Sequence, residues 1–293
     1  MSVLRTGWVD ASFRYWSLWP CIGILGALSV YPVLQLVPMA LSTIEIAGGV
    51  PVWNFTPRRN LDMLMADAVL RDSLRNTLVF VALSVVAEMV LGFFLALFIA
   101  CMKRGRGLAR TVMILPILLP PVAIGSMWKL MYNYDFGLFN QMLRAIGIGP
   151  ANFLGNVDFA LLAVVAVDIW HWTPLVFLIL FAAIESLPGE VLEAARIDGA
   201  SMGQTIRLVI LPLLGPALAV AALFRAIAAF KAFDQVYLLT SGGPGTATEI
   251  VSLHLNRVFF EQNQLGYGAM LSLAVIGAIA ASLGVARLTT PRR

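Results

Sequence analysis

The chain has 293 residues, of which 60% are hydrophobic and 12% are charged, and its formal net charge is +4. Soluble domains average roughly 45–50% apolar and about 25% charged residues, so this composition excludes an ordinary soluble domain and predicts an integral membrane protein. The basic residues are dispersed among apolar runs, which favours membrane orientation over nucleic-acid binding as the reason for the positive charge. Cys21 and Cys101 each end an apolar run, so the cysteines indicate neither a disulfide framework nor a metal site.

Six apolar runs have about the 20 residues that a helix needs to cross a bilayer, and they predict an all-α protein with six transmembrane helices. The predicted spans are 19–41, 77–100, 111–131, 160–182, 208–231 and 267–286. The first run is longer than the ~7–15 apolar residues of a signal peptide, so we expect it to be a membrane anchor. We assign residues 19–286 to one membrane domain, with an N-terminal segment at 1–18 and a tail at 287–293.

Lysine and arginine residues orient these spans. If the N-terminus lies in the cytoplasm, the inner segments hold eleven basic residues and the outer loops hold six. The inner residues are Arg5, Arg14, Lys103, Arg104, Arg106, Arg110, Arg196, Arg207, Arg287, Arg292 and Arg293, and the outer ones are Arg58, Arg59, Arg71, Arg75, Arg144 and Arg257. Because inner loops carry the excess of positive charge, we predict that both termini and the stretch 186–212 are cytoplasmic.

The polar stretch 186–212 separates two apolar runs. Helix formers occupy 190–197, and Gly199 then breaks the helix, because glycine reverses the chain without steric cost. Ser201 and Gln204 stand three residues apart, as in a capping box at the start of a helix. The pattern therefore predicts a helix, a turn and a second helix.

Two further stretches resemble each other, ILPILLP at 114–120 and ILPLLGP at 210–216. Proline is tolerated in the first turn of a helix, where its missing N–H has no partner in any case. We therefore expect helices to begin near these prolines, by convergence rather than by an internal repeat.

The loop and several other stretches resemble permease subunits of binding-protein-dependent ABC importers. Within the loop, the resemblance is carried by Glu193, Ala194, Ala195, Gly199, Val209, Leu211 and Pro212. Elsewhere, RNTLVF at 75–80, ILPILLPPVAIGSMWKLMYN at 114–133, FDQVYLLTSGGPGTAT at 233–248 and LGYGAM at 265–270 are similar to the carbohydrate and glycerol-phosphate branch of that family. Gly203 and Ile206 depart from it, because members often carry aromatic residues there.

The resemblance implies a type I permease fold and a subunit that moves a sugar or sugar derivative across the bacterial cytoplasmic (inner) membrane. It implies no cofactor in this chain, since ATP and Mg would be used by a separate ATPase. The implied partners are a second homologous permease, two ATP-binding subunits, an extracytoplasmic solute-binding protein, the sugar and the lipid bilayer, with no nucleic acid. The residues implied to couple to the ATPase are Glu193, Ala194, Ala195, Arg196, Asp198, Gly199, Ala200 and Ser201.

Glu88, Asp168 and Arg225 lie within predicted spans, away from their ends. Each would cost on the order of 2.5–3.5 kcal/mol if it faced lipid, so we expect all three to face protein or water. His171 and Trp172 follow Asp168 by three and four residues and share its helix face. The cluster either lines the substrate pathway or ties the spans together, and Glu88 either lines that pathway or pairs with Arg225.

Trp128 and Tyr132 end the third predicted span. Aromatic residues commonly form a belt at the membrane surface, and this is one interpretation of both rings. The alternative places Trp128 on the substrate pathway.

Two other classes of function compete with the importer subunit. A secondary transporter would use Glu88 or Asp168 as the ion-coupling carboxylate, and a membrane enzyme would use Asp168 with His171. We assign no catalytic residue. His171 and His254 lie far apart without paired carboxylates or cysteines, so we expect no metal site.

The chain itself is not expected to hydrolyse ATP. A P-loop requires glycine, lysine and then serine or threonine, whereas Lys103, Lys129 and Lys231 follow Met102, Trp128 and Phe230.

Overall fold

The computed structural model describes residue 13 and residues 16–289, with side chains as far as residue 280. Predictions for the ends of the N-terminal segment and of the tail therefore lie outside the described residues. The chain divides into two compact units, one formed by residues 68–254 and the other by the described residues up to Asp67 together with those from Leu255. The assignment of 19–286 to one membrane domain stays a prediction.

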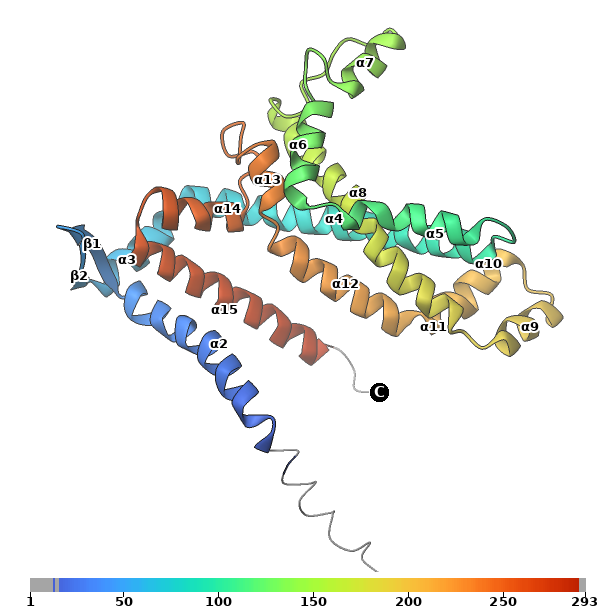
Figure 1. Ribbon diagram of the computed structural model, residues 1–293, viewed down its shortest axis with the longest axis horizontal. Coiled ribbons are helices and arrows are strands. Elements are labelled where there is room, and N and C mark those ends of the chain that lie inside the picture. The colour runs from blue at the N-terminus through green and yellow to red at the C-terminus, as the bar shows by residue number, and fades with distance from the viewer. Residues whose placement is uncertain (1–12, 14–15, 290–293) are drawn as a thin grey trace, which may run out of the picture. The chain divides into compact units, whose positions relative to one another are not determined.

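The unit of residues 68–254 is helical, and its elements are labelled in Figure 1. Its longer helices are α4 (Ala68–Cys101), α8 (Val157–Glu185), α12 (Gly215–Phe230) and α6 (Pro121–Met131). Its shorter elements are α5 (Arg106–Ile114), η1 (Leu115–Leu118), α7 (Leu138–Ala145), α9 (Gly189–Ile197), α10 (Met202–Thr205), η2 (Ile206–Ile210), α11 (Leu211–Leu213), α13 (Asp234–Leu239) and the start of α14 (Val251–Asn256).

Helices α4, α8 and α12 pack against one another and form the centre of this unit. Gly92 permits the close approach of α4 to α8, because a Cβ atom at this position would lie 2.7 Å from Cγ1 of Val176. Around this crossing lies one apolar cluster, whose fully buried members include Ala96, Val176, Phe177 and Leu180. Where the helices are surrounded by water, burial of these apolar side chains stabilises their association. Within lipid, van der Waals contact between closely packed side chains stabilises it instead.

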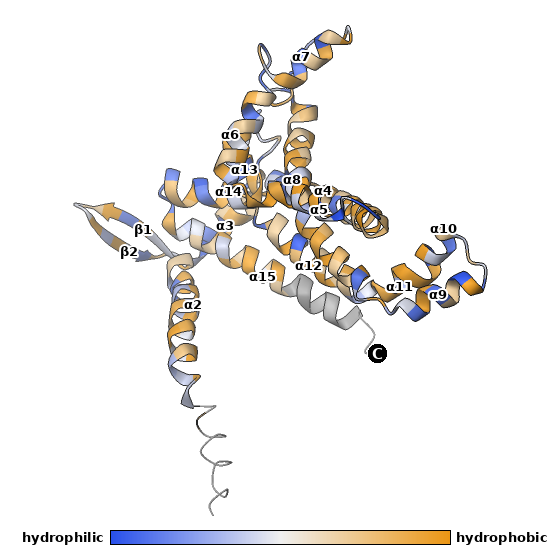
Figure 2. Ribbon diagram, turned by 45° about the vertical axis from the view of Figure 1, so that its right-hand side comes forward, coloured by the Kyte–Doolittle hydropathy of each residue, from blue (hydrophilic) through white to orange (hydrophobic). Residues whose placement is uncertain are grey.

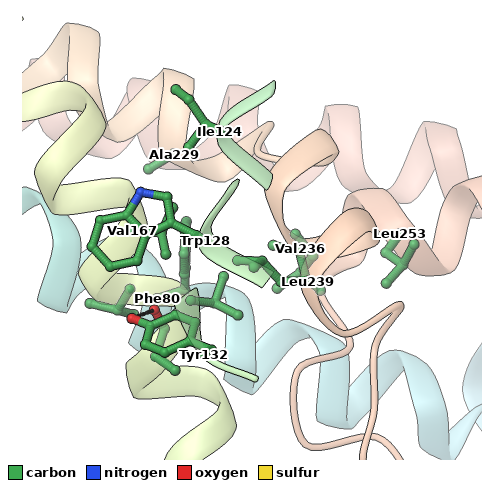
Figure 3. Packing of buried hydrophobic residues seen from close by; sticks show 13 residues of the cluster. Phe80, Ile124, Trp128, Tyr132, Val167, Ala229, Val236, Leu239 and Leu253 are labelled. Atoms are coloured by element: carbon green, nitrogen blue, oxygen red, sulfur yellow. Dashed lines mark hydrogen bonds between the residues drawn. The ribbon is translucent and has the colours of Figure 1, made fainter. Parts of the chain in front are cut away.

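A second apolar cluster is aromatic and lies where α6 and α13 meet α8 (Figure 3). Trp128 and Tyr132 are buried in it, and the Tyr132 hydroxyl donates a hydrogen bond of 3.1 Å to the backbone oxygen of Ala163. The ring of Trp128 contacts Phe139 and Trp170 at centroid distances of 5.7 and 5.5 Å. Offset and edge-to-face pairs of this kind stabilise a packed aromatic core.

Helices begin at both proline-rich stretches, as predicted, with α6 starting at Pro121 and α12 carrying Pro216 in its first turn. The chain also bends sharply at both places. The helical segments Arg106–Leu118 and Pro121–Met131 meet at 94°, and Met202–Leu213 and Gly215–Phe230 meet at 68°. Pro120 has extended backbone angles because it precedes Pro121, and the residue before a proline is disfavoured in the helical region. At the second bend, Pro216 has no N–H with which to continue the hydrogen-bond ladder.

The segment GGPGTAT is held against the first turns of α4. The Asn76 side-chain amide donates to the backbone oxygens of Thr246 and Glu249, at 2.8 and 3.0 Å. The Val251 N–H donates to the hydroxyl of Thr77 at 3.0 Å. These bonds join residues more than 160 positions apart in the sequence and fix the segment 246–251 against α4.

The other unit contains a hairpin that the all-α prediction did not include. The elements of this unit are α2 (Trp19–Ala40), β1 (Ser42–Ala47), β2 (Val50–Phe55), α3 (Pro57–Ala66), η3 (Arg257–Glu261) and α15 (Leu265–Thr289). The antiparallel strands β1 and β2 are joined at Gly48 and Gly49, whose φ angles are +61° and +81°. Two successive positive φ angles produce the tight turn that suits the twist of a hairpin.

All six predicted spans coincide with helical segments, but they differ in length and straightness. Within the described part of the chain, α2, α4 and α8 are long and apolar enough to cross a membrane, and five spans result if each bent pair is counted as one. The apolar part of α15 described here, Leu265–Ala280, is shorter. Apolar residues dominate α2 and α12, whereas α9 and α10 carry many hydrophilic residues (Figure 2). The count of six and the orientation remain predictions.

Candidate functional site

The loop between α8 and α12 has the predicted helix, turn and helix. Helix α9 ends in a Schellman motif, in which the N–H of Ala200 donates to the Ala195 oxygen at 3.0 Å and the N–H of Gly199 to the Arg196 oxygen at 3.1 Å. Gly199 adopts a φ of +73°, as this motif requires. Ser201 and Gln204 then form a complete capping box at the start of α10. The Schellman motif that ends α9 and the capping box that begins α10 together fix a sharp turn between the two helices.

The surface of this loop is mixed, with exposed charged residues beside exposed apolar side chains that include Ile197, Met202 and Leu208. Glu193, Arg196 and Asp198 are exposed, whereas Ala195 is buried. Ile197, at the last position of α9, is 86% exposed. An apolar side chain so exposed at a turn is available for contact with another protein or with lipid.

The three charged residues predicted within the spans meet in one buried cluster. The Arg225 guanidinium donates to both carboxylate oxygens of Glu88, through Nε to Oε2 and through Nη2 to Oε1 at 2.7 Å. The same Nη2 donates to Oδ2 of Asp168 at 2.8 Å. All three side chains are almost completely buried. The alternative in which Glu88 pairs with Arg225 is therefore confirmed, and the cluster joins α4, α8 and α12.

Asp168, His171 and Trp172 lie together, as their spacing predicts. The Arg225 guanidinium carbon lies 4.8 Å from the centre of the Trp172 ring, a cation–π geometry. The His171 ring contacts that of Trp172 at 4.9 Å. Nδ1 of His171 is 2.7 Å from the side-chain nitrogen of Gln235, so this imidazole nitrogen accepts the hydrogen bond. The charge cluster thus continues into a polar face that carries His171 and Gln235.

A cavity of about 140 Å³ opens on this face. Its polar lining is formed by Asp168, His171, Lys231, Asp234 and Gln235, and its apolar lining by Pro121, Trp172, Ala228, Ala232 and Phe233. Oε1 of Gln235, which lines the cavity, is a buried polar atom without a hydrogen-bond partner among the described residues. Buried polar groups normally have partners, so this oxygen is available to a ligand in the cavity.

Gln235 was missed by the sequence analysis. It lies in the first turn of α13, within the stretch FDQVYLLT, and nothing in its local pattern distinguishes it from other polar residues in the first turn of a helix. Its proximity to His171 arises from packing between residues 64 positions apart.

The belt interpretation of Trp128 and Tyr132 is wrong for this chain. The two residues are 9% and 7% exposed and pack inside the aromatic cluster, so their rings do not reach a lipid interface. Trp128 also lies outside the residues that line the cavity beside Asp168. Its assignment to the substrate pathway gains no support from that geometry.

Comparison with known proteins gives a consistent result. Residues 88–293 match the family described as "Binding-protein-dependent transport system inner membrane component". The trehalose/maltose transport system permease protein MalF of Thermococcus litoralis is 34% identical over 264 residues, which cover 90% of this chain and 88% of the relative. The trehalose transport system permease protein SugA of Mycobacterium tuberculosis is 29% identical, with coverage of 89% and 83%.

A solved structure shares the fold. A chain from the crystal structure of a bacterial ABC transporter involved in the import of the acidic polysaccharide alginate superposes with a TM-score of 0.79 at 23% identity, covering 97% of this chain and 99% of the other. The fold and the relatives define the class as the permease subunits of ABC transporters. The chain itself belongs to the family of binding-protein-dependent transport system inner membrane components.

Proposed function

We propose that this chain is the membrane-spanning subunit of an ATP-driven importer and that it moves a sugar or sugar derivative across the cytoplasmic membrane. The observation that carries the proposal is the cavity beside Asp168, where an indole ring, an imidazole, an amide and a carboxylate converge. Trehalose and maltose appear in the names of relatives, which supports a sugar as the cargo.

The chemistry of this cavity suits a polyhydroxylated ligand. The ring of Trp172 offers an apolar surface on which a sugar ring can stack, and the exposed edge of a sugar supplies hydroxyl groups. Oε1 of Gln235 is a buried acceptor for a hydroxyl proton, and Asp168 is a second acceptor near it. A hydroxyl both donates and accepts, so one group can satisfy several of these atoms.

The buried cluster is proposed to hold this face in place. Arg225 bridges the carboxylates of Glu88 and Asp168 and at the same time lies against Trp172. Because the guanidinium is planar and donates in fixed directions, it orients both acids and the indole together. Arg225 and Glu88 therefore position the residues that border the pathway.

The loop 186–212 is proposed to couple this chain to a separate ATPase. Its support is the rigid turn at Gly199, the exposed polar residues Glu193, Arg196 and Asp198, and the exposed side chain of Ile197. An apolar anchor within a polar surface is typical of a contact that forms between proteins. The ATPase would use ATP and Mg, and this chain would not hydrolyse ATP.

The remaining partners and the orientation are proposed with the function. The importer would contain a second homologous permease, two ATP-binding subunits and an extracytoplasmic solute-binding protein, in a bacterial inner membrane. Six spans with both termini in the cytoplasm would place the loop 186–212 within reach of the ATPase. The distribution of basic residues supports this orientation.

The test compares substitutions at the cavity with a substitution of an exposed residue. We expect Trp172→Ala and Gln235→Ala to lower the rate of sugar uptake or its apparent affinity, whereas Trp16→Ala, at an exposed tryptophan, should leave both unchanged. Assembly is measured in parallel by co-purification with the partner subunits. If both cavity variants assemble and transport at the parental rate and affinity, the cavity does not border the pathway. If they fail to assemble, the cluster is structural.

A further inference from the structure

The β1–β2 hairpin has two chemically different faces. Residues opposite each other in an antiparallel pair point to the same side, and successive residues alternate between sides. The pairs Ile44 with Trp53 and Ile46 with Pro51 therefore share a face with Phe55, whose partner is Ser42. The other face carries the polar residues Thr43, Glu45 and Asn54, together with Ala47, Val50 and Val52. We call the side formed by Ile46, Pro51, Trp53 and Phe55 the aromatic face.

The aromatic face is uncovered within the chain. Ile46, Trp53 and Phe55 are 63%, 47% and 74% exposed. On the β1 edge of the same side, Ser42 and Ile44 are buried where β1 meets α2, α3 and α15, whereas their β2 partners Phe55 and Trp53 stay exposed. The aromatic face thus lies beside a packed surface, and contiguous exposed apolar area of this kind marks an interaction site.

The surroundings of the hairpin indicate what covers this face. Strand β1 begins two residues after the end of α2, a candidate membrane span in which no residue of the apolar window is buried within the chain. The helix presents exposed apolar side chains up to its last turns, including Leu34 and Val37. Figure 2 shows the hairpin extending sideways from the end of α2, across the direction of that helix. A hairpin with this orientation lies along the membrane surface if α2 crosses the bilayer.

We propose that the hairpin is an interfacial anchor whose aromatic face inserts into the headgroup and upper acyl region of the bilayer. Tryptophan and phenylalanine side chains are suited to this region, and Glu45 and Asn54 on the opposite face remain in water. The aromatic face then contacts the lipid beside the end of α2. This inference depends on α2 crossing the membrane and not on the cargo of the transporter.

The test measures the depth of single probes on the two faces. In the full-length chain with both native cysteines replaced by serine, cysteines are introduced at Phe55→Cys on the aromatic face and at Asn54→Cys on the polar face. Each is labelled with an environment-sensitive nitrobenzoxadiazole probe in vesicles of phosphatidylethanolamine and phosphatidylglycerol. We expect lipids with a nitroxide near the carbonyls to quench the probe at 55 several-fold more than that at 54, and aqueous iodide to show the reverse order.

A second matched pair, Ile46→Cys and Glu45→Cys, makes the result independent of either position. Equal quenching of both faces by nitroxide lipid, or quenching of the aromatic face by iodide alone, would overturn the proposal. Protection of position 55 only after the solute-binding protein is added would also overturn it, because the aromatic face would then be a protein-docking surface. Sugar uptake is measured separately, on vesicles that contain the labelled chain together with its partner permease and ATPase, and shows whether the proposed transport function holds.

Discussion

Replacing Gly199 with valine tests the proposed coupling role of the loop 186–212 by changing the preference of one backbone angle. Gly199 has a φ of +73°, and no atom lies within 4 Å of the position that a Cβ would occupy. The substitution therefore introduces no clash with neighbouring atoms, and its cost is the conformational energy of a left-handed residue, roughly 1–2 kcal/mol and at the upper end for a β-branched side chain. A cost of this size lowers the population of the observed turn by a factor of about 5–30.

The assay measures ATP hydrolysis and uptake in the reconstituted importer. We expect Gly199→Val to reduce the stimulation of ATP hydrolysis by loaded binding protein several-fold, while the chain still inserts and assembles. Gly203→Val is the matched control, since Gly203 lies in the same loop with open space around it but without a positive φ. Unchanged stimulation in Gly199→Val, or an equal loss in the control, would refute the role of the turn.

Three further predictions concern the buried cluster, the loop after α6 and the orientation. Arg225→Met leaves two buried carboxylates without their cation and should lower the free energy of unfolding by about 3–5 kcal/mol. Glu88→Gln retains the pair between Arg225 and Asp168 and should lower it less. Asn140→Ala removes bonds of 2.8, 3.0 and 3.1 Å and should speed amide hydrogen exchange in the segment 133–156, at a cost of ~1–3 kcal/mol. In intact cells, an impermeant thiol reagent should label a cysteine at 54 but not at 190.

Each of these predictions has a control and an outcome that contradicts it. Equal melting temperatures for Arg225→Met and Glu88→Gln would show that the arginine does not compensate both acids. Gln141→Ala, which removes one exposed bond, should leave exchange in 133–156 unchanged, and an equal effect of both substitutions would contradict the role of Asn140. Labelling at 190 but not at 54 would reverse the topology.

The coupling loop could be predicted from sequence because its determinants are local. Glycine at the end of α9 and the pair Ser201 and Gln204 each act within a few residues of the chain, so their patterns specify the turn directly. The pairing of Glu88 with Arg225 was one of two alternatives, since burial of charge in a membrane requires a partner but does not say which one.

Other features depend on packing that the sequence pattern does not record. Apolarity indicates the length of a membrane segment but not its direction, so the helix starts near Pro121 and Pro216 were predicted but the bends there were not. Gln235 acquires its role only because α13 packs beside α8. The hairpin was not predicted, although Gly48 and Gly49 supply a turn signal. Its strands have six residues each and give a much weaker apolar pattern than a membrane span.

The central claim is that this chain carries a sugar as part of an ATP-driven importer. The most direct measurement is the uptake of a labelled sugar that stabilises the cognate solute-binding protein, into vesicles that contain the chain with its partner permease and ATPase, with loaded solute-binding protein on one side and ATP on the other. We expect uptake that requires ATP and every subunit and that falls with Trp172→Ala. Uptake by this chain alone, driven by a proton or sodium gradient without ATP, would contradict it.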